Sequence, residues 1–186
     1  MKLIVAITGA SGGTLALRFL EKLPEEIEVY AVLSKGAKKA LKYESKLSYK
    51  NVLKRSNITV FKDKDIAAPI ASGSFKVDKM IILPCSMNTL AKCANGISDS
   101  LITRAFTVML KEKREVILSP RELPYSAIVL ENMLKLSHLN VTIAPPMIAY
   151  YSNQKTIEDM ENFIIGKWFD LLKIDNNLYK RWKSNE

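Results

Sequence analysis

A glycine-rich turn, ITGASGG at residues 7–13, directly follows the apolar run KLIV near the start of the chain. Backbone amides at the beginning of a helix, joined by a hydroxyl group, favour an anion, so the segment Gly9-Ala10-Ser11 could hold a phosphate. Two common phosphate motifs do not fit. A Walker loop needs a lysine that Gly12-Gly13-Thr14 lacks, and the dinucleotide fingerprint needs a glycine where Ser11 stands.

Polar side chains also follow other apolar runs. Ser34 comes after the run VYAVL, where a dinucleotide-binding protein would carry an acid for a ribose hydroxyl. In the segment PCSMNTLAKCANG, Ser86 and Asn88 are expected to be N-cap residues of the helix that follows. Capping explains one of the hydrogen-bonding side chains of Ser86, Asn88 and Thr89 but not all three, so the others are free to meet a ligand.

Charged and aromatic residues follow the last two apolar runs. Arg121 and Glu122 come directly after a buried-type run, and an arginine there can grip a phosphate or carboxylate at two points. A structural ion pair is the alternative. Of Tyr150 and Tyr151, one is expected to pack and the other to direct its hydroxyl at a ligand. The expected site has hydroxyls, a turn that can bind phosphate and an arginine, but no acid to hold a ribose. This combination favours flavin mononucleotide (FMN) over NAD or ATP as the ligand. The residues alone do not indicate which reaction is catalysed.

These positions depend on an alternation of strands and helices. Apolar runs of strand length, nearly continuous in Val, Ile and Leu, occupy residues 3–7, 29–33, 58–61, 80–84, 115–119 and 141–144. Helix-like segments occupy residues 15–23, 36–44, 87–94, 100–113, 126–139 and 156–173. The alternation predicts an α/β protein with a three-layer Rossmann-like (flavodoxin-like) fold, in which a central parallel sheet has helices on both faces. The strand carboxyl ends then share one edge, where ligands of such folds bind.

Composition limits the class of protein. The chain has 186 residues, which predicts a single domain over residues 1–186. No apolar run approaches the ~20 residues that span a membrane, so a cytoplasmic location and no membrane partner are expected. The net charge of +9 is spread over helical faces without a nucleic-acid module, so no nucleic-acid partner is expected. Cys85 and Cys93 match no metal spacing, and His138 is the one histidine, so no metal is expected.

Four segments together resemble the flavin prenyltransferases of the UbiX family: GASGG, PCSMNTLAKCANGISDSLITRAFTVMLKEKREVIL, PRELPYSAIVLENMLKLS and APPMIAYYSNQKTIEDMENFIIGKWFDLL. The resemblance implies transfer of a dimethylallyl group from dimethylallyl phosphate, or its pyrophosphate, to reduced FMN without a metal. The product, prenylated FMN, serves UbiD-type decarboxylases. The family assembles into a homododecamer whose neighbouring subunits complete each site, and the tail from about residue 174 is expected to pack on a neighbour.

The resemblance also assigns residues. Flavin-binding positions of the family match Gly9, Ala10, Ser11, Ser34, Ser86, Met87, Asn88, Thr89 and Arg121. Further polar positions of the active site, expected to be catalytic, match Glu44, Arg104, Lys111 and Glu122. The positions that bind the allylic substrate match Tyr151, Lys167 and Trp182. Many members carry arginine where Lys167 stands, and lysine keeps the charge but loses the two-point grip.

Two other functions share parts of this pattern. The first is an FMN-dependent cysteine decarboxylase of the phosphopantothenoylcysteine type, which needs an active-site histidine and a Pro-x-Met-Asn segment. Here His138 falls at a helix end and residues 145–148 read PPMI. The second is a non-catalytic flavin-binding protein, which has no need of the charges at Arg104, Lys111, Glu122 and Lys167.

Overall fold

The computed structural model describes residues 1–45 and 47–182. The chain divides into two compact units, Met1–Pro145 and Pro146–Glu186. Part of the tail that was expected to pack on a neighbour, residues 183–186, lies outside the described residues.

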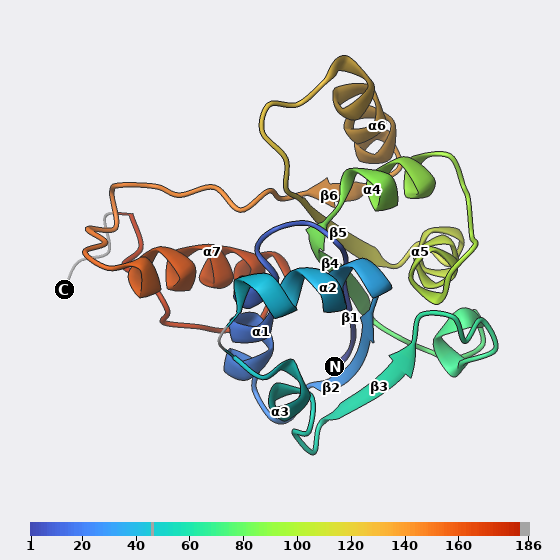
Figure 1. Cartoon of the computed structure of the whole chain (residues 1–186), viewed down its shortest axis with the longest axis horizontal. Coiled ribbons are helices and arrows are strands. Elements are labelled where there is room, and N and C mark those ends of the chain that lie inside the picture. The colour runs from blue at the N-terminus through green and yellow to red at the C-terminus, as the bar shows by residue number, and fades with distance from the viewer. Residues whose placement is uncertain (46, 183–186) are drawn as a thin grey trace. The chain divides into compact units, whose positions relative to one another are not determined.

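The first unit contains one six-stranded sheet in the order β3-β2-β1-β4-β5-β6 (Figure 1). The strands are β1 (Lys2–Ile7), β2 (Glu28–Leu33), β3 (Ile58–Lys62), β4 (Lys79–Cys85), β5 (Glu115–Pro120) and β6 (Val141–Ile143). All five pairings are parallel, so every carboxyl end lies at the same edge. The order reverses between β1 and β4, which makes the end of these two strands the expected ligand position.

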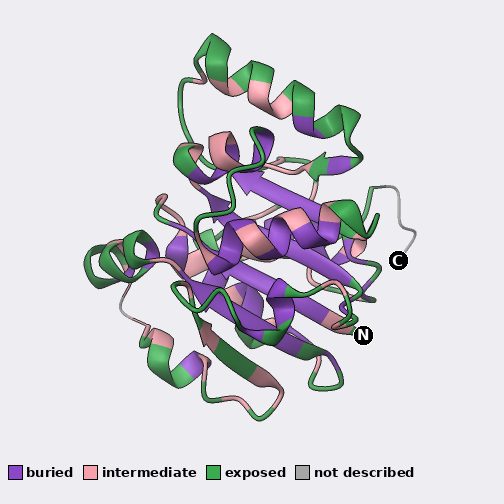
Figure 2. Ribbon diagram, turned by 90° about the vertical axis from the view of Figure 1, so that its right-hand side faces the viewer, coloured by how far each residue is buried: buried purple, intermediate pink, exposed green. Residues whose placement is uncertain are grey.

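Both faces of the sheet are covered, which explains the nearly continuous apolar strands. Ile4 and Ala6 of β1 belong to a core cluster with Leu90 and Phe106. The alternate residues of β1, such as Val5, are equally buried and point to the opposite face. Figure 2 shows the buried strands at the centre with more exposed helices outside. The predicted three-layer α/β fold is therefore confirmed.

Six helices of the first unit connect the strands: α1 (Gly13–Lys22), α2 (Lys35–Glu44), α3 (Tyr49–Val52), α4 (Met87–Ala94), α5 (Leu101–Lys111) and α6 (Ala127–His138). A 3₁₀ turn, η1 (Pro69–Ala71), lies before β4. Serine side chains cap the first turns of α2, α4, α5 and α6, because a serine oxygen accepts a backbone N–H that has no partner within the helix. The sequence pattern predicted neither α3 nor η1, since each is too short to show a hydrophobic period.

The second unit contains the helix α7 (Ile157–Leu171). A capping box starts it: the Thr156 hydroxyl accepts the Asp159 N–H at 3.1 Å, and the Asp159 carboxylate accepts the Thr156 N–H at 2.9 Å. This agrees with the predicted helix at 156–173 to within two residues. Of the helices in the described residues, none combines the length and apolarity needed to cross a membrane.

Candidate functional site

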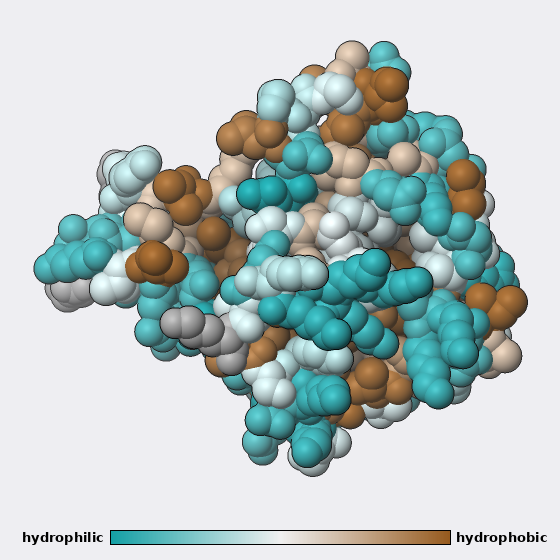
Figure 3. Space-filling model, in the orientation of Figure 1, coloured by the Kyte–Doolittle hydropathy of each residue, from teal (hydrophilic) through white to brown (hydrophobic). Residues whose placement is uncertain are grey.

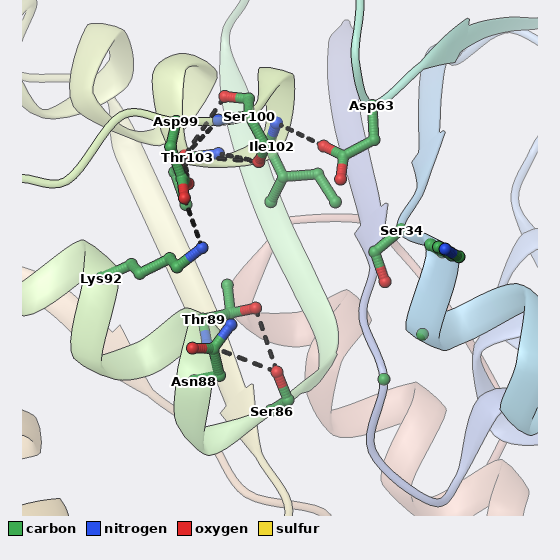
Figure 4. Close-up of a pocket in the computed structure, with 13 residues that line it drawn as sticks. Ser34, Asp63, Ser86, Asn88, Thr89, Lys92, Asp99, Ser100, Ile102 and Thr103 are labelled. Atoms are coloured by element: carbon green, nitrogen blue, oxygen red, sulfur yellow. Dashed lines mark hydrogen bonds and ion pairs between the residues drawn. The ribbon is translucent and has the colours of Figure 1, made fainter.

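A pocket of about 410 Å³ opens at the carboxyl edge of the sheet, around the ends of β1, β2 and β4 (Figure 4). Five residues predicted to bind flavin line it: Gly9, Ser34, Ser86, Asn88 and Thr89. The lining also includes Lys35, Gly36, Asp63, Lys92, Asp99, Ser100, Ile102 and Thr103. Residues from five separate segments thus meet at the point where the strand order reverses.

Thr8 holds the ends of β1 and β4 together. Its buried hydroxyl donates to the Pro84 carbonyl at 2.7 Å and accepts the Ser86 N–H at 2.8 Å. The backbone N–H of Thr8 also donates to Pro84, at 3.2 Å. Thr8 therefore fixes where the pocket segment after β4 begins. Sequence reasoning missed it, although a threonine directly after a buried strand is the signal that would have found it.

Ser86 is the N-cap of α4. Its hydroxyl accepts the Thr89 N–H at 3.3 Å and lies 3.0 Å from the Thr89 hydroxyl. The expectation that Asn88 is an N-cap is wrong, because Asn88 lies inside the first turn of α4. Its amide group is consequently not used for capping and lines the pocket. Ser86 therefore caps the helix, and the side chains of Ser86, Asn88 and Thr89 all line the pocket.

Two glycines bring the first turn against α2. A Cβ atom on Gly9 would lie 3.0 Å from the Gly36 Cα, and one on Gly36 would lie 3.1 Å from the Gly9 Cα. Beside them, the Ser34 hydroxyl accepts the Ala37 N–H at 3.0 Å as the N-cap of α2. This hydroxyl still has its proton to donate, so Ser34 can cap the helix and bind a ligand oxygen together.

The glycine turn already holds one anion. The Glu44 carboxylate, from the last residue of α2, accepts the Gly12 N–H at 3.0 Å. Gly12 has a φ of 99°, a left-handed conformation that suits glycine. The structure therefore brings Glu44, which the family resemblance assigns to the active site, to the glycine turn, and the bond shows that an anionic oxygen fits there.

Charged residues of the pocket were largely missed by sequence reasoning. Lys92 forms an ion pair with Asp99 at 2.6 Å across the pocket wall. Hydrogen bonding to Lys92 holds the pKa of the Asp99 carboxyl below its usual value. Asp63 follows β3 and caps α5, accepting the Ile102 N–H at 3.1 Å. Asp63 could have been found, since it stands at a strand end like the other polar residues of the pocket.

Within the second unit, Tyr151 and Trp182 meet. Their ring centroids are 5.4 Å apart, edge to face, and the Tyr151 ring meets Phe163 in the same manner at 5.7 Å. Lys167 lies on α7, half exposed, and its ammonium group is 3.9 Å from the Asp170 carboxylate. Because that distance is long for an ion pair, the ammonium group keeps its capacity to bind an anion.

Comparison with known proteins identifies the family. A family model described as Flavoprotein matches residues 1–169. The flavin prenyltransferase UbiX of Helicobacter pylori is 55% identical to this chain over the full length of both proteins. The chain belongs to the UbiX family of flavin prenyltransferases. Neither alternative function is favoured by this similarity.

Two crystal structures of UbiX proteins resemble this chain closely. One is AnUbiX (PadA1) in complex with FMN and dimethylallyl pyrophosphate, with a TM-score of 0.92 and 40% identity; the match covers 100% of this chain and 98% of that one. The other is a dodecameric FMN-dependent UbiX-like decarboxylase from Escherichia coli O157:H7, with a TM-score of 0.93 and 40% identity; the match covers 99% of this chain and 100% of that one.

Other residues that were expected to bind flavin lie outside the pocket lining. Ala10, Ser11, Met87 and Arg121 are absent from it. Arg121 is exposed, and its backbone N–H donates to Cys85 at 3.2 Å. Within residues 1–45 and 47–182, neither Arg121 nor Glu122 forms an ion pair, so the structural alternative for these charges is not observed.

Arg104 and Lys111, which the family resemblance assigned to the active site, lie on α5. The Arg104 Nε donates to the Ala71 carbonyl at 3.1 Å. Lys111 is the last residue of α5 and pairs with Glu112. Since α5 has 11 residues, Lys111 lies about 15 Å from the end of the helix that faces the pocket. One chain does not bring Lys111 to its own pocket.

Asp170 joins α7 to the segment after it. The carboxylate accepts hydrogen bonds from Tyr179 at 2.6 Å, from Asn176 at 3.0 Å and from Arg181 at 2.8 Å. Burial opposes ionisation of Asp170, but these bonds outweigh it and lower the pKa of the carboxyl below 3.8. Burial and the bond to Asp170 raise the pKa of Tyr179 to about 12.

Acid should loosen this part of the second unit. Because the folded state lowers the pKa of Asp170, its stabilisation is present above the ordinary value of 3.8 and is lost as the pH falls through the lowered pKa. Both tryptophans, Trp168 and Trp182, lie in this unit, so their emission should change between about pH 4 and about pH 2. The variant Asp170→Asn should lack that acid step; an unchanged step would contradict the assignment.

Both cysteines are free and buried. Burial raises the pKa of the Cys85 thiol well above its usual value, and burial raises the pKa of Cys93 to about 12. Both thiols are neutral near pH 7 and pack in the core.

Proposed function

We propose that this protein transfers a dimethylallyl group from dimethylallyl phosphate, or the pyrophosphate, to reduced FMN. The allylic C–O bond breaks and its electron pair leaves with the phosphate. The carbon freed from the phosphate bonds to the central-ring nitrogen of the flavin, which loses its proton. The double bond of the allyl group then takes up a proton at its inner carbon while its outer carbon bonds to the adjacent benzenoid carbon, which releases its hydrogen as a proton. The observation that carries the proposal is the hydroxyl-lined pocket at the β1–β4 switch point, in a chain of the UbiX family.

The residues of the pocket fit FMN. Ser34, Ser86 and Thr89 offer hydroxyls for a ribityl chain, and Lys35 and Lys92 supply positive charge for a phosphate. The close approach of Gly9 and Gly36 keeps the backbone near the ligand, where side chains would fill the space. Asp63 and Asp99 are engaged with the α5 amide and Lys92, so no free acid repels the phosphate. When bound, reduced flavin supplies the electron-rich ring atoms that accept the allyl group.

The remaining family positions serve the departing phosphate. We assign Tyr151 and Lys167 to hold it, and Trp182 to line the dimethylallyl site beside Tyr151. Fixed cations and hydroxyls stabilise the negative charge that develops on the leaving group, and this stabilisation supplies most of the rate acceleration in such a reaction. Arg104, Lys111 and Glu122 are assigned to the same centre through subunit contacts, and Glu44 to the turn beside Gly12.

An oligomer is part of the proposal. α6 is apolar on its exposed side: Ile128 is 71% exposed, Leu130 52% and Leu134 57%. Figure 3 shows apolar side chains over α6 at the top of the molecule. An apolar patch of this kind marks a protein contact, and a similar UbiX-like protein forms a dodecamer. We propose that copies of this chain cover α6 in a dodecamer, with both units belonging to one flavoprotein domain.

Placing a charge on α6 should disrupt assembly. The variant Leu134→Asp would bury a carboxylate in the contact, which costs several kcal/mol per site. Light scattering should give a dodecamer for the wild type and smaller species for this variant. Lys135→Asp, on the same helix, is the matched control and should change assembly less. Equal masses for Leu134→Asp and the wild type would exclude α6 as a contact.

The test of function is the mass of the flavin. Incubation with reduced FMN and each allylic donor should increase the flavin mass by one isoprene unit. FMN bound but unchanged with both donors would favour a non-catalytic flavin-binding protein. Release of carbon dioxide from a cysteine conjugate would favour the cysteine decarboxylase. A UbiD-type decarboxylase as recipient of prenylated FMN, and a cytoplasmic location, stay predictions from the sequence.

A further inference from the structure

Four lysines surround a second hollow at the carboxyl edge of the sheet. It measures about 400 Å³ and is lined by Leu33, Lys35, Lys38, Lys62, Asp63 and Lys64. Lys35 and Lys38 come from the first turns of α2, and Lys62 and Lys64 from the end of β3 and the turn after it. The parallel pairing of Leu33 with Lys62 brings these two segments side by side. This lysine cluster is Lys35, Lys38, Lys62 and Lys64.

The charges of the lysine cluster are not neutralised. All four side chains are exposed, and none forms an ion pair within the described part of the chain. The one acid in the lining, Asp63, is already used: its side chain accepts the Ile102 N–H at 3.1 Å and its carbonyl accepts the Leu101 N–H at 2.7 Å. Four cations therefore face one engaged carboxylate around a concave surface.

The placement of Lys35 and Lys38 opposes helix stability. The first turn of a helix is its positive end, where an acid stabilises and a lysine destabilises by about 0.3–1 kcal/mol. α2 has no acid in its first turn and begins with Lys35. The helix end adds its own positive potential to that of the lysines, so together they concentrate a positive field on the hollow. Hydrophilic side chains cover α2 on the face shown in Figure 3.

The lysine cluster adjoins the flavin pocket. Lys35 and Asp63 line both hollows, so the two hollows lie next to each other. Figure 4 places Asp63 and Ser34 on one side of the flavin pocket, opposite Lys92 and Thr89. An anion attracted to the lysine cluster would lie directly beside the pocket mouth.

We propose that the lysine cluster is an entry site for a phosphate monoester, where the phosphate of incoming FMN is captured before the flavin settles in the pocket. This inference rests on the proposed FMN binding but concerns the route of binding. Lys62 and Lys64 do not line the flavin pocket. Their charges should therefore raise the association rate without holding the bound flavin.

Stopped-flow fluorescence with oxidised FMN tests the entry site. The double variant Lys62→Gln/Lys64→Gln should reduce the association rate constant about tenfold at low salt, with the dissociation rate constant unchanged. The matched control is Lys50→Gln/Lys54→Gln, which removes the same charge. Those exposed lysines precede β3, and the strand of five residues separates them from Lys62 by about 15 Å. The association rate constant of the control variant should fall less than twofold.

Riboflavin, salt and turnover complete the test. Riboflavin lacks the phosphate, so its association rate should be equal in all three proteins. At high salt the difference between the variants should vanish for FMN, because the field is screened. The proposed entry site would be refuted if the association rate constant fell equally in both double variants, or if only the dissociation rate constant changed. Prenyl transfer at saturating FMN should be unchanged in Lys62→Gln/Lys64→Gln. If the wild type bound no FMN, both the entry site and the proposed function would be refuted.

Discussion

Replacing Lys167 with alanine should lower the rate of prenyl transfer by about 100- to 1000-fold and leave FMN affinity nearly unchanged. Removing one preorganised group that stabilises developing charge has an effect of this size. Lys167 is half exposed and only loosely paired with Asp170, so its ammonium group is available to a phosphate. It lies in the second unit, whereas the pocket that fits FMN is formed by the first. Single-turnover transfer and FMN titration would separate the two effects.

Two variants sharpen this test. Lys155→Ala removes an exposed lysine from the same unit and should leave transfer within a factor of about two, since a surface charge alone contributes little. Lys167→Arg should retain transfer and shift the preference toward the pyrophosphate, because guanidinium can bind two phosphate oxygens at once. Ordinary turnover in Lys167→Ala would show that another group binds the leaving phosphate.

Replacing Gly36 with valine should weaken FMN binding by about 10- to 100-fold, the range that an overpacking cost of 1–3 kcal/mol produces. Even the Cβ atom of an alanine would lie 3.1 Å from the Gly9 Cα, and that neighbour is backbone. Gly36 also lines the flavin pocket. The larger side chain must push the start of α2 away from the first turn, which separates Ser34 from the other hydroxyls.

A graded series isolates the contact between the glycines. Gly36→Ala should cause an intermediate loss of FMN affinity, since the backbone needs to move only a few tenths of an ångström to relieve the contact with Gly9. Lys42→Val introduces the same β-branched residue on an exposed position of α2 and should leave FMN binding unchanged. FMN titration and thermal unfolding of each variant would be compared. Wild-type affinity in Gly36→Val would contradict the role given to this contact.

The fold was predictable because each strand carries its own signal. The six apolar runs correspond to β1–β6 within two residues. The signal is clearest in β1, β2, β4 and β5, because strands buried on both faces are apolar at nearly every position. Because ligands of such folds bind at the strand ends, the positions of Ser34, Ser86 and Thr89 in the pocket could be predicted from the strands. Short elements such as α3 and η1 gave no such signal, because four or three residues do not complete a helical period.

Contacts between distant residues were not predictable from local pattern. Asp63 caps a helix that begins 38 residues later, and nothing in FKDKD indicates its partner. The bond from Gly12 to Glu44 likewise joins positions 32 residues apart. Lys111 looks like an exposed helix end in the sequence and is one in the isolated chain. Only the family resemblance gives Lys111 a proposed role, because nothing in the local sequence around it indicates a ligand.

The neutral thiols have a consequence for an enzyme that works with reduced flavin. Reduced flavin reacts with oxygen and yields hydrogen peroxide, which oxidises cysteines through their thiolate form. Cys85 directly precedes Ser86 of the pocket, yet it is fully buried and its raised pKa leaves almost no thiolate. Exposure to air during turnover should therefore spare the protein from sulfenic acid formation at both of its sulfhydryl groups.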